Sequence, residues 1–246
     1  METKKILLKD KIDNGILRLT LNNPKNQNTL SELMMDSLKK AFSDAATDQS
    51  IRVIILAANG AIFCAGHDLK EITEARKSQD SGTDYFKQLF DSCSELMQMI
   101  VSNPKPVIAE VDGIATAAGC QLVASCDLAI ATNDSKFATP GVNIGLFCST
   151  PMVALSRNVA KKHAMEMLLT GDMIDSKNAK VIGLINNHVS KDLLMEKTLS
   201  IANKIANKSA MTVKMGKQAF YIQSELELSE AYKYTSKIMV ENMLKE

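Results

Sequence analysis

A stretch of small side chains runs from Ala115 to Cys120, directly before an apolar segment, Cys120 to Ser125, with a helical pattern. Small side chains let a ligand approach the backbone closely, and the first turn of a helix offers unpaired N–H groups and a partial positive charge. This combination can hold a phosphate, or an oxyanion that forms on a carbonyl oxygen. The pattern is equally typical of tight packing between a helix and a strand, so the stretch alone leaves both interpretations open.

Cysteine and histidine are the other residue types here that could do chemistry. The five cysteines are scattered without metal-ligand spacing, and most lie in apolar runs: Cys64, Cys93, Cys120, Cys126 and Cys148. We therefore expect reduced, buried thiols in a reducing compartment. The chain has only three histidines and none is paired with a cysteine, which argues against a zinc site. We expect no metal.

Composition excludes several classes of function. The chain has 246 residues, 46% of them hydrophobic, and a formal charge of +1, so no global field recruits nucleic acid or a membrane. Tryptophan is absent and aromatic residues make up 4%, which argues against base-stacking platforms. The N-terminal residues carry charge without a following apolar run, and no apolar stretch approaches membrane-spanning length. The sequence therefore predicts a cytoplasmic protein with no nucleic-acid or membrane partner.

The order of the expected elements suggests a repeated unit. Alternating or continuous apolar runs predict strands at 6–8, 15–21, 53–57 and 107–109, with a hairpin turn at 13–15. Helical spacing follows at 31–42, 85–101 and 120–125, so a strand–strand–helix order recurs three times. From residue 191 onward the pattern is helical throughout. We expect an α/β core over 1–190 and a helical region over 191–246 that packs on the core or on another subunit.

Three motifs stand in a specific order along the chain: NNPKNQNTL at 22–30, FCAGHDLKE at 63–71, and the segment from Asp112-Gly113 to Cys126-Asp127. Together they resemble the enoyl-CoA hydratase/isomerase family, also called the crotonase superfamily, over nearly the entire chain. AAGCQLVASCD with FATPGVNIGLFCSTP resembles one branch of that family in particular. The resemblance implies a crotonase-like spiral of ββα units, a C-terminal helical trimerisation region, and a homotrimer or a dimer of trimers.

The resemblance also implies a ligand and a site. The ligand is an acyl thioester of coenzyme A, bound as substrate or ligand and not as a permanent cofactor. The family holds the thioester carbonyl oxygen between two backbone N–H groups, which here match those of His67 and Ala118. This agrees with the helix N-terminus singled out above.

Contacts to the nucleotide part of coenzyme A also carry over by resemblance. They fall on the loop after the second strand and around the first oxyanion donor: Lys25, Asn26, Gln27, Ala65, His67, Asp68 and Leu69. In the C-terminal helices, Lys217 and Phe220 match positions that approach the cofactor of a neighbouring subunit.

The chain departs from the family at the two glutamates that add water across the double bond. The first falls at Gln121 and the second at Gly141. A glutamine does not exchange a proton near neutral pH, and glycine has no side chain. Ordinary hydration at full rate is therefore not expected. Gln121 either orients a water molecule or serves as a packing amide.

Two other side chains, His67 and Cys148, leave the type of reaction undecided. His67 resembles a histidine of a family decarboxylase of malonyl-type thioesters, but that enzyme has a tyrosine where this chain has Cys148. His67 is therefore either an acid/base or carboxylate-positioning group, or a histidine without a direct role. Cys148 is a nucleophile only if a base lies within reach, and otherwise an inert buried thiol. The sequence leaves two functions: an enzyme that stabilises a thioester enolate, and a non-catalytic acyl-CoA-binding protein.

Overall fold

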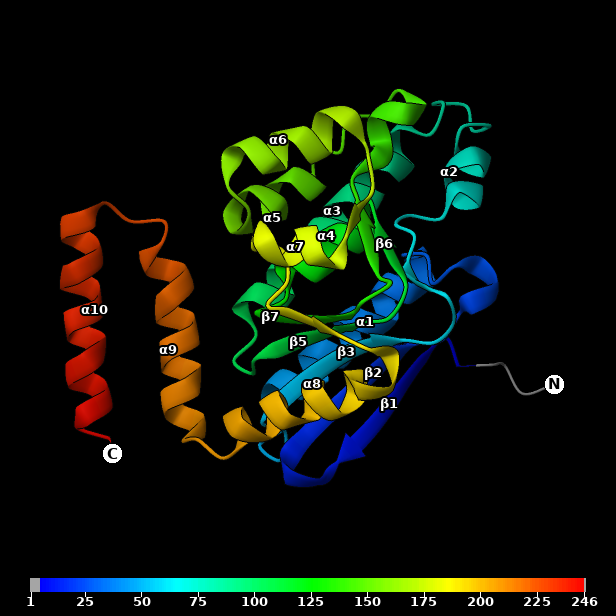
Figure 1. Cartoon of the computed structure of the whole chain (residues 1–246). Coiled ribbons are helices and arrows are strands. Elements are labelled where there is room, and N and C mark those ends of the chain that lie inside the picture. Colours follow the sequence, from blue (N-terminus) through cyan, green and yellow to red (C-terminus); the bar gives the residue numbers. More distant parts are fainter. Residues whose placement is uncertain (1–4, 246) are drawn as a thin grey trace.

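Two sheets and ten α-helices make up the computed structural model, which describes residues 5–245 (Figure 1). The larger sheet has the order β1-β2-β3-β5-β7-β10, and only the β1–β2 pair is antiparallel. Its strands are β1 (Leu7–Ile12), β2 (Ile16–Leu21), β3 (Val53–Ala58), β5 (Val107–Val111), β7 (Leu128–Thr132) and β10 (Asn187–Val189). The smaller sheet consists of β4 (Ile62–Cys64), β6 (Ile114–Thr116), β8 (Lys136–Ala138) and β9 (Ile174–Asp175).

The helices follow the strands in a regular order. They are α1 (Glu32–Thr47), α2 (Leu69–Ala75), α3 (Thr83–Ser102), α4 (Ala118–Ser125), α5 (Pro151–Asn158), α6 (Lys161–Thr170), α7 (Ser176–Val181), α8 (Lys191–Ala206), α9 (Ala210–Gln223) and α10 (Leu228–Met243). Short 3-10 helices lie at Asp13–Gly15, Pro24–Asn26 and Pro140–Ile144. The predicted ββα repeat is confirmed: β1-β2-α1, β3-β4 followed by α2 and α3, and β5-β6-α4 succeed one another.

Successive units place their strands in different sheets. β3 and β5 enter the larger sheet, whereas β4 and β6, which follow them, pair in the smaller one. The apolar runs of β3 and β5 are buried throughout apart from the last residue of β3, because helices cover both faces of a parallel sheet. The ends of β4 and β6 thereby lie side by side, with Cys64 opposite Ala115.

Two hydrophobic clusters divide the core. The larger one joins α1, α3 and α4 to one face of the larger sheet. The smaller one lies on the other face, under α8, and consists of Ile16, Val53, Ile55, Ile108, Ile130, Leu194, Ala202 and Ala206. The first helix after residue 190 therefore packs on the sheet of the core.

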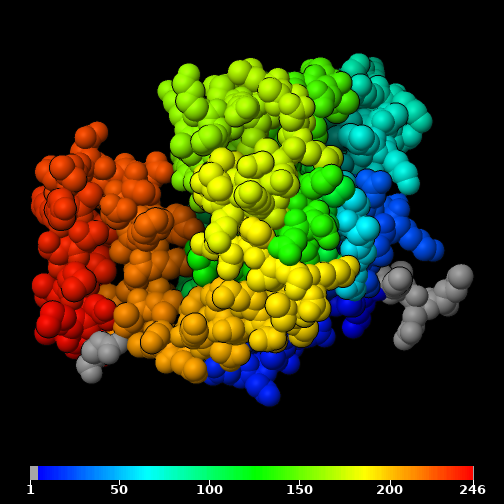
Figure 2. Space-filling view, in the orientation of Figure 1, coloured from blue at the N-terminus to red at the C-terminus, as the bar shows by residue number. Residues whose placement is uncertain are grey.

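Helices α9 and α10 form an antiparallel pair beside the rest of the chain, seen in orange and red (Figures 1 and 2). Their exposed side chains include many large apolar residues: Phe220, Ile222, Leu228, Tyr232, Met239, Val240 and Met243. A division of the chain at residue 190 and a role of these helices in assembly stay predictions.

No helix of the described residues is long and apolar enough to cross a membrane.

Candidate functional site

A pocket of about 480 Å³ lies where the loop after β2, the loop after β4 and the end of β6 meet. All seven residues predicted to contact a nucleotide line it: Lys25, Asn26, Gln27, Ala65, His67, Asp68 and Leu69. Three residues that the sequence analysis did not assign complete the lining, namely Thr29, Lys70 and Thr116. Thus segments about 40 and 90 residues apart along the chain form one cavity of ligand-binding size.

Backbone hydrogen bonds hold these loops together. The Leu30 N–H donates to the Gly66 carbonyl oxygen at 2.7 Å, and the Ala65 N–H donates to the Gln27 carbonyl oxygen at 3.2 Å. The Thr116 hydroxyl donates to the Ala65 carbonyl oxygen at 3.2 Å. The loop after β4 is therefore fixed on both sides.

Gly66 brings this loop up against the start of α4. A β-carbon at Gly66 would lie 3.2 Å from the backbone nitrogen of Ala118 and 3.0 Å from the β-carbon of Ala117. The φ angle of Gly66 is +92°, in a region that residues other than glycine rarely adopt. The residue before His67 thus contacts Ala118, the other residue proposed from the sequence as an oxyanion donor.

Both backbone N–H groups are free to donate to a ligand. Among the turn, loop and cap hydrogen bonds of residues 5–245, neither His67 nor Ala118 donates to a backbone acceptor. Helix α4 begins at Ala118, two residues earlier than expected from the sequence, so its N–H has no acceptor within the helix.

The backbone immediately before α4 is strained. Ala117 has φ 51° and ψ −121°, a conformation that costs on the order of 1–3 kcal/mol for a residue with a side chain. Its N–H donates to the Ala138 carbonyl oxygen, and its own carbonyl oxygen accepts the Gln121 N–H, both at 3.0 Å. At Gly119, a β-carbon would overlap the Cys64 carbonyl oxygen, so α4 rests directly on the end of β4. This strain and close packing fix the direction of the Ala118 N–H.

The imidazole of His67 has few polar neighbours. Both ring nitrogens are buried without a hydrogen-bond partner among the described residues, and the ring packs edge-on against Phe90 at 5.7 Å between centroids. Burial lowers the pKa of His67 below its ordinary value. The ring is therefore neutral near pH 7, and solvent does not reach its nitrogens.

The charged residues of the pocket differ in how they are held. The Asp68 carboxylate accepts the Lys70 backbone N–H at 2.9 Å and the Thr29 hydroxyl at 3.2 Å, so it caps α2. The Lys70 ammonium lies 3.5 Å from the Asn26 side-chain oxygen, at the limit of a hydrogen bond. Lys25 makes no ion pair with any described residue. Two lysine ammonium groups are thus available to an anionic ligand.

Gln121 lies in α4, which is buried throughout. Its side chain lines a second, more apolar cavity of about 580 Å³ between α3, α4 and α5, and no residue lines both cavities. The Gln121 side-chain oxygen lies 3.9 Å from the Cys93 sulfur, which donates a weak hydrogen bond. The structure does not bring the Gln121 side chain into the cavity of His67.

Gly141 is buried in the Pro140–Ile144 turn and acts only through its backbone. Its N–H donates to the Cys148 sulfur at 3.3 Å, and its carbonyl oxygen accepts the Leu146 N–H at 2.9 Å. Burial raises the pKa of the Cys148 thiol, opposed in part by that N–H. A thiol kept protonated is a poor nucleophile, which favours the inert interpretation of Cys148.

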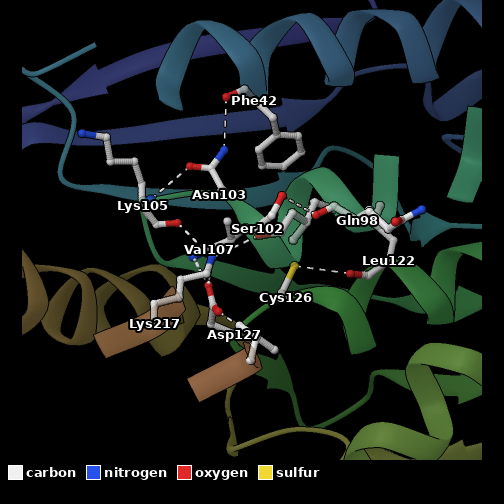
Figure 3. Close-up of polar contacts among 12 residues, drawn as sticks. Phe42, Gln98, Ser102, Asn103, Lys105, Val107, Leu122, Cys126, Asp127 and Lys217 are labelled. Atoms are coloured by element: carbon white, nitrogen blue, oxygen red, sulfur yellow. Dashed lines mark hydrogen bonds and ion pairs between the residues drawn. The ribbon is translucent and has the colours of Figure 1, made fainter. Parts of the chain in front are cut away.

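Lys217 is held inside this chain. Its ammonium pairs with the Asp127 carboxylate at 2.7 Å and donates to the Ile100 and Lys105 carbonyl oxygens, both at 3.1 Å (Figure 3). Burial lowers the pKa of Lys217, and the Asp127 charge opposes this. Phe220, one turn further along α9, is 63% exposed. Their predicted approach to a neighbour's ligand stays a prediction; in this chain Lys217 anchors α9.

Comparison with known proteins extends the likeness to the whole chain. The family model described as enoyl-CoA hydratase/isomerase matches residues 11–246. "Enoyl-CoA hydratase domain-containing protein 3, mitochondrial" is 49% identical in Xenopus laevis, covering 94% of this chain and 77% of that protein, and 48% identical in Homo sapiens, covering 93% and 74%. This is the branch that the sequence motifs resemble. The 2,3-dehydroadipyl-CoA hydratase of Escherichia coli is 33% identical, covering 87% and 81%.

Solved structures give the same result for the fold. The human enoyl-CoA hydratase domain-containing protein 3 matches with a TM-score of 0.92 at 47% identity, covering 98% of this chain and 92% of that one. An enoyl-CoA hydratase from Mycobacterium smegmatis matches with a TM-score of 0.93 at 48% identity, covering 98% and 91%. The predicted crotonase-like spiral is therefore confirmed, and the chain belongs to the enoyl-CoA hydratase/isomerase family.

Proposed function

We propose that this protein binds acyl thioesters of coenzyme A and stabilises the enolate of the thioester between the backbone N–H groups of His67 and Ala118. The observation that carries the proposal is the close approach of Gly66 to Ala118, whose nitrogen a β-carbon at Gly66 would meet at 3.2 Å, beside a pocket that Lys25 and Lys70 line. Two backbone donors held in place lower the free energy of an oxyanion between them, because they need no reorganisation when the charge develops.

The pocket supports each part of such a ligand. The phosphates of coenzyme A lie near the Lys25 and Lys70 ammonium groups, and the amide and hydroxyl groups of Asn26, Gln27 and Thr29 offer donors and acceptors to the remainder. The thioester carbonyl oxygen accepts the two N–H groups. The strain at Ala117 is consistent with a site preorganised for this contact.

We propose that the reaction is not ordinary hydration. Hydration needs one group to remove a proton from water and another to protonate the α-carbon. Gln121 and Gly141 supply neither group. Decarboxylation of a malonyl-type thioester remains, because loss of CO2 gives the enolate without removal of a proton by the protein. Slow isomerisation through the enolate and hydrolysis of the thioester are the other reactions that remain.

The decarboxylation alternative assigns the His67 imidazole to the departing carboxylate. The burial of both unpartnered ring nitrogens weighs against that role, since solvent does not reach them among the described residues. The backbone N–H of His67 fits the geometry better than its side chain. A second candidate, a non-catalytic acyl-CoA-binding protein, is favoured by the loss of both glutamates.

The experiment is calorimetric binding of acetyl-, crotonyl-, malonyl- and methylmalonyl-CoA, with free coenzyme A as reference, followed by mass spectrometry of the same mixtures. Binding with turnover of one ester identifies the reaction. Binding of esters without turnover of any supports the non-catalytic candidate. Absence of binding refutes the proposal, and only the family membership then remains.

We further propose a homotrimer or a dimer of trimers, supported by the exposed apolar side chains of α9 and α10. Light scattering coupled to gel filtration gives the mass in solution, and a monomer would contradict it. The cytoplasmic location also stays a prediction, and fractionation of cells that express the protein tests it.

A further inference from the structure

A separate pocket of about 320 Å³ lies at the base of α9, where the end of α1, the start of β3 and the α8–α9 junction meet. Three cationic side chains line it: Arg52, Lys105 and Lys214. Its apolar wall includes Ile51, Ile205 and Met211. No residue lines both this pocket and the pocket of His67.

The cations of this pocket are not neutralised. Among the described residues, no carboxylate lines the pocket, and neither Lys105 nor Lys214 takes part in an ion pair. The Arg52 guanidinium donates to the Lys208 carbonyl oxygen. Asp48 is the acidic group that acts on Lys105, and it already pairs with Lys11 at 3.0 Å.

Lys105 is held in place by its backbone. Its N–H donates to the Asn103 side-chain oxygen at 3.0 Å, and its carbonyl oxygen accepts the Lys217 ammonium at 3.1 Å. Figure 3 shows its side chain extending away from Lys217 and Asp127. Burial lowers the pKa of Lys105, and the neighbouring charges of Arg52 and Lys214 lower it further. The ammonium is thus kept among like charges, which is unfavourable until an anion arrives.

The start of α9 adds to this positive potential. The helix begins at Ala210, and both Ala210 and Met211 line the pocket. Backbone N–H groups of a first helical turn favour a negative charge nearby. Here that effect adds to the charges of the three side chains that line the pocket.

We propose that this pocket binds the phosphate group of a small organic phosphate. The phosphate contacts Arg52, Lys105 and Lys214, and the carbon part of the ligand lies on the apolar wall. Because Arg52 and Lys105 belong to the core whereas Lys214 belongs to α9, the bound anion also joins α9 to the core. This site is independent of the proposed acyl-CoA site.

The test is isothermal titration of the full chain with inorganic phosphate at constant ionic strength. Lys105→Met and Lys214→Met should each weaken binding roughly tenfold, since each removes a charge-assisted hydrogen bond. Lys105→Arg should retain most of the affinity. Lys162→Met, on the exposed face of α6, is the matched control for net charge and should leave binding unchanged.

A further control separates the two pockets. Lys25→Met should leave phosphate binding at this site intact, because Lys25 lines the other pocket. Thermal melting checks the fold of each variant. If Lys105→Met proves unstable, the Lys214→Met variant provides the test, because Lys214 is exposed. The proposal is overturned by absence of saturable binding, by binding that Lys214→Met leaves unchanged, or by binding that only Lys25→Met removes.

Discussion

Gly141 faces the carbonyl oxygen of Leu146 so closely that a β-carbon at Gly141 would overlap it, and the same β-carbon would lie 2.8 Å from the Cys148 sulfur. The Leu146 N–H closes this turn onto the Gly141 carbonyl oxygen. The position that matches the second hydratase glutamate therefore has no room for any side chain. A glutamate side chain at Gly141 therefore fits only if the loop that contains Leu146 and Cys148 moves.

This crowding predicts opposite effects for two glycine-to-alanine substitutions. Gly141→Ala should lower the free energy of unfolding by about 2 kcal/mol, because a methyl group is forced into a packed turn. Gly216→Ala is the matched control: nothing lies within 4 Å of its β-carbon position in α9, and it should gain about 0.8 kcal/mol from helix propensity. Urea denaturation measures both. Equal stability of the two variants would show that the turn is not closed.

The buried imidazole of His67 predicts a pH-dependent stability. Because burial lowers the folded-state pKa of His67, the unfolded state binds more protons just below about pH 6.5, and stability falls as the pH drops through that window. His67→Phe keeps the contact with Phe90 and removes the titrating group. Its urea midpoint should therefore change less between about pH 7.5 and about pH 5.5 than that of the unmodified protein.

His163→Phe, on the exposed side of α6, is the matched control for the loss of an imidazole outside this pocket. His67→Phe also retains the backbone N–H, so any turnover found with the CoA esters should persist. Loss of turnover in a folded His67→Phe protein would assign the chemistry to the imidazole.

Much of this architecture could be predicted from the sequence, because it depends on local patterns. Apolar runs such as Val53 to Ala57 predict buried strands, and small residues before Cys120 predict a helix start that a ligand can approach. The assignment of His67 and Ala118 as oxyanion donors is what the resemblance to the family implies, and it stays a prediction. The sequence predicts the start of α4 two residues too late. The helix is preceded by Ala117, whose strained backbone conformation leaves no signal in the sequence pattern.

Other features depend on contacts between distant segments and were not predicted. Thr116 lines the pocket only because β4 and β6 pair. The crowding at Gly141 comes from Leu146, and the burial of Lys217 from Asp127, 90 residues earlier in the chain. Lysines in an amphipathic helix are usually exposed, so no signal in α9 identified the buried one.

The Lys217–Asp127 pair predicts a large effect on stability. Lys217→Met leaves the Asp127 carboxylate, which is only 16% exposed, without its cationic partner, although the Tyr221 hydroxyl still donates to it at 2.9 Å. The expected loss is about 3 kcal/mol. Arg157→Met breaks an exposed ion pair of the same region, with Glu225 at 3.3 Å, and should cost less than about 1 kcal/mol. Chemical denaturation compares the two, and similar losses would contradict the anchoring role of Lys217.

Lys25, which lines the pocket of His67, predicts a salt-dependent contact with the phosphates of coenzyme A. Lys25→Met should weaken binding of free coenzyme A and of its esters by the same factor, about threefold to tenfold, because it removes a contact to phosphate and not to the acyl group. Added salt should reduce the difference between the variant and the unmodified protein. Calorimetry at two salt concentrations measures it, with Lys162→Met as control. A selective effect on one ester would place Lys25 at the acyl end instead.

The proposed function depends on the Ala118 N–H binding the thioester carbonyl oxygen. Ala118→Pro removes this N–H at the first position of a helix, where the helix itself needs no N–H donor. The decisive measurement is the affinity of crotonyl-CoA relative to free coenzyme A, by calorimetry, in the unmodified protein and in a folded Ala118→Pro variant. We predict that the thioester binds more tightly than free coenzyme A and that the variant loses this preference while it still binds free coenzyme A. A preference that survives in the variant would contradict the account.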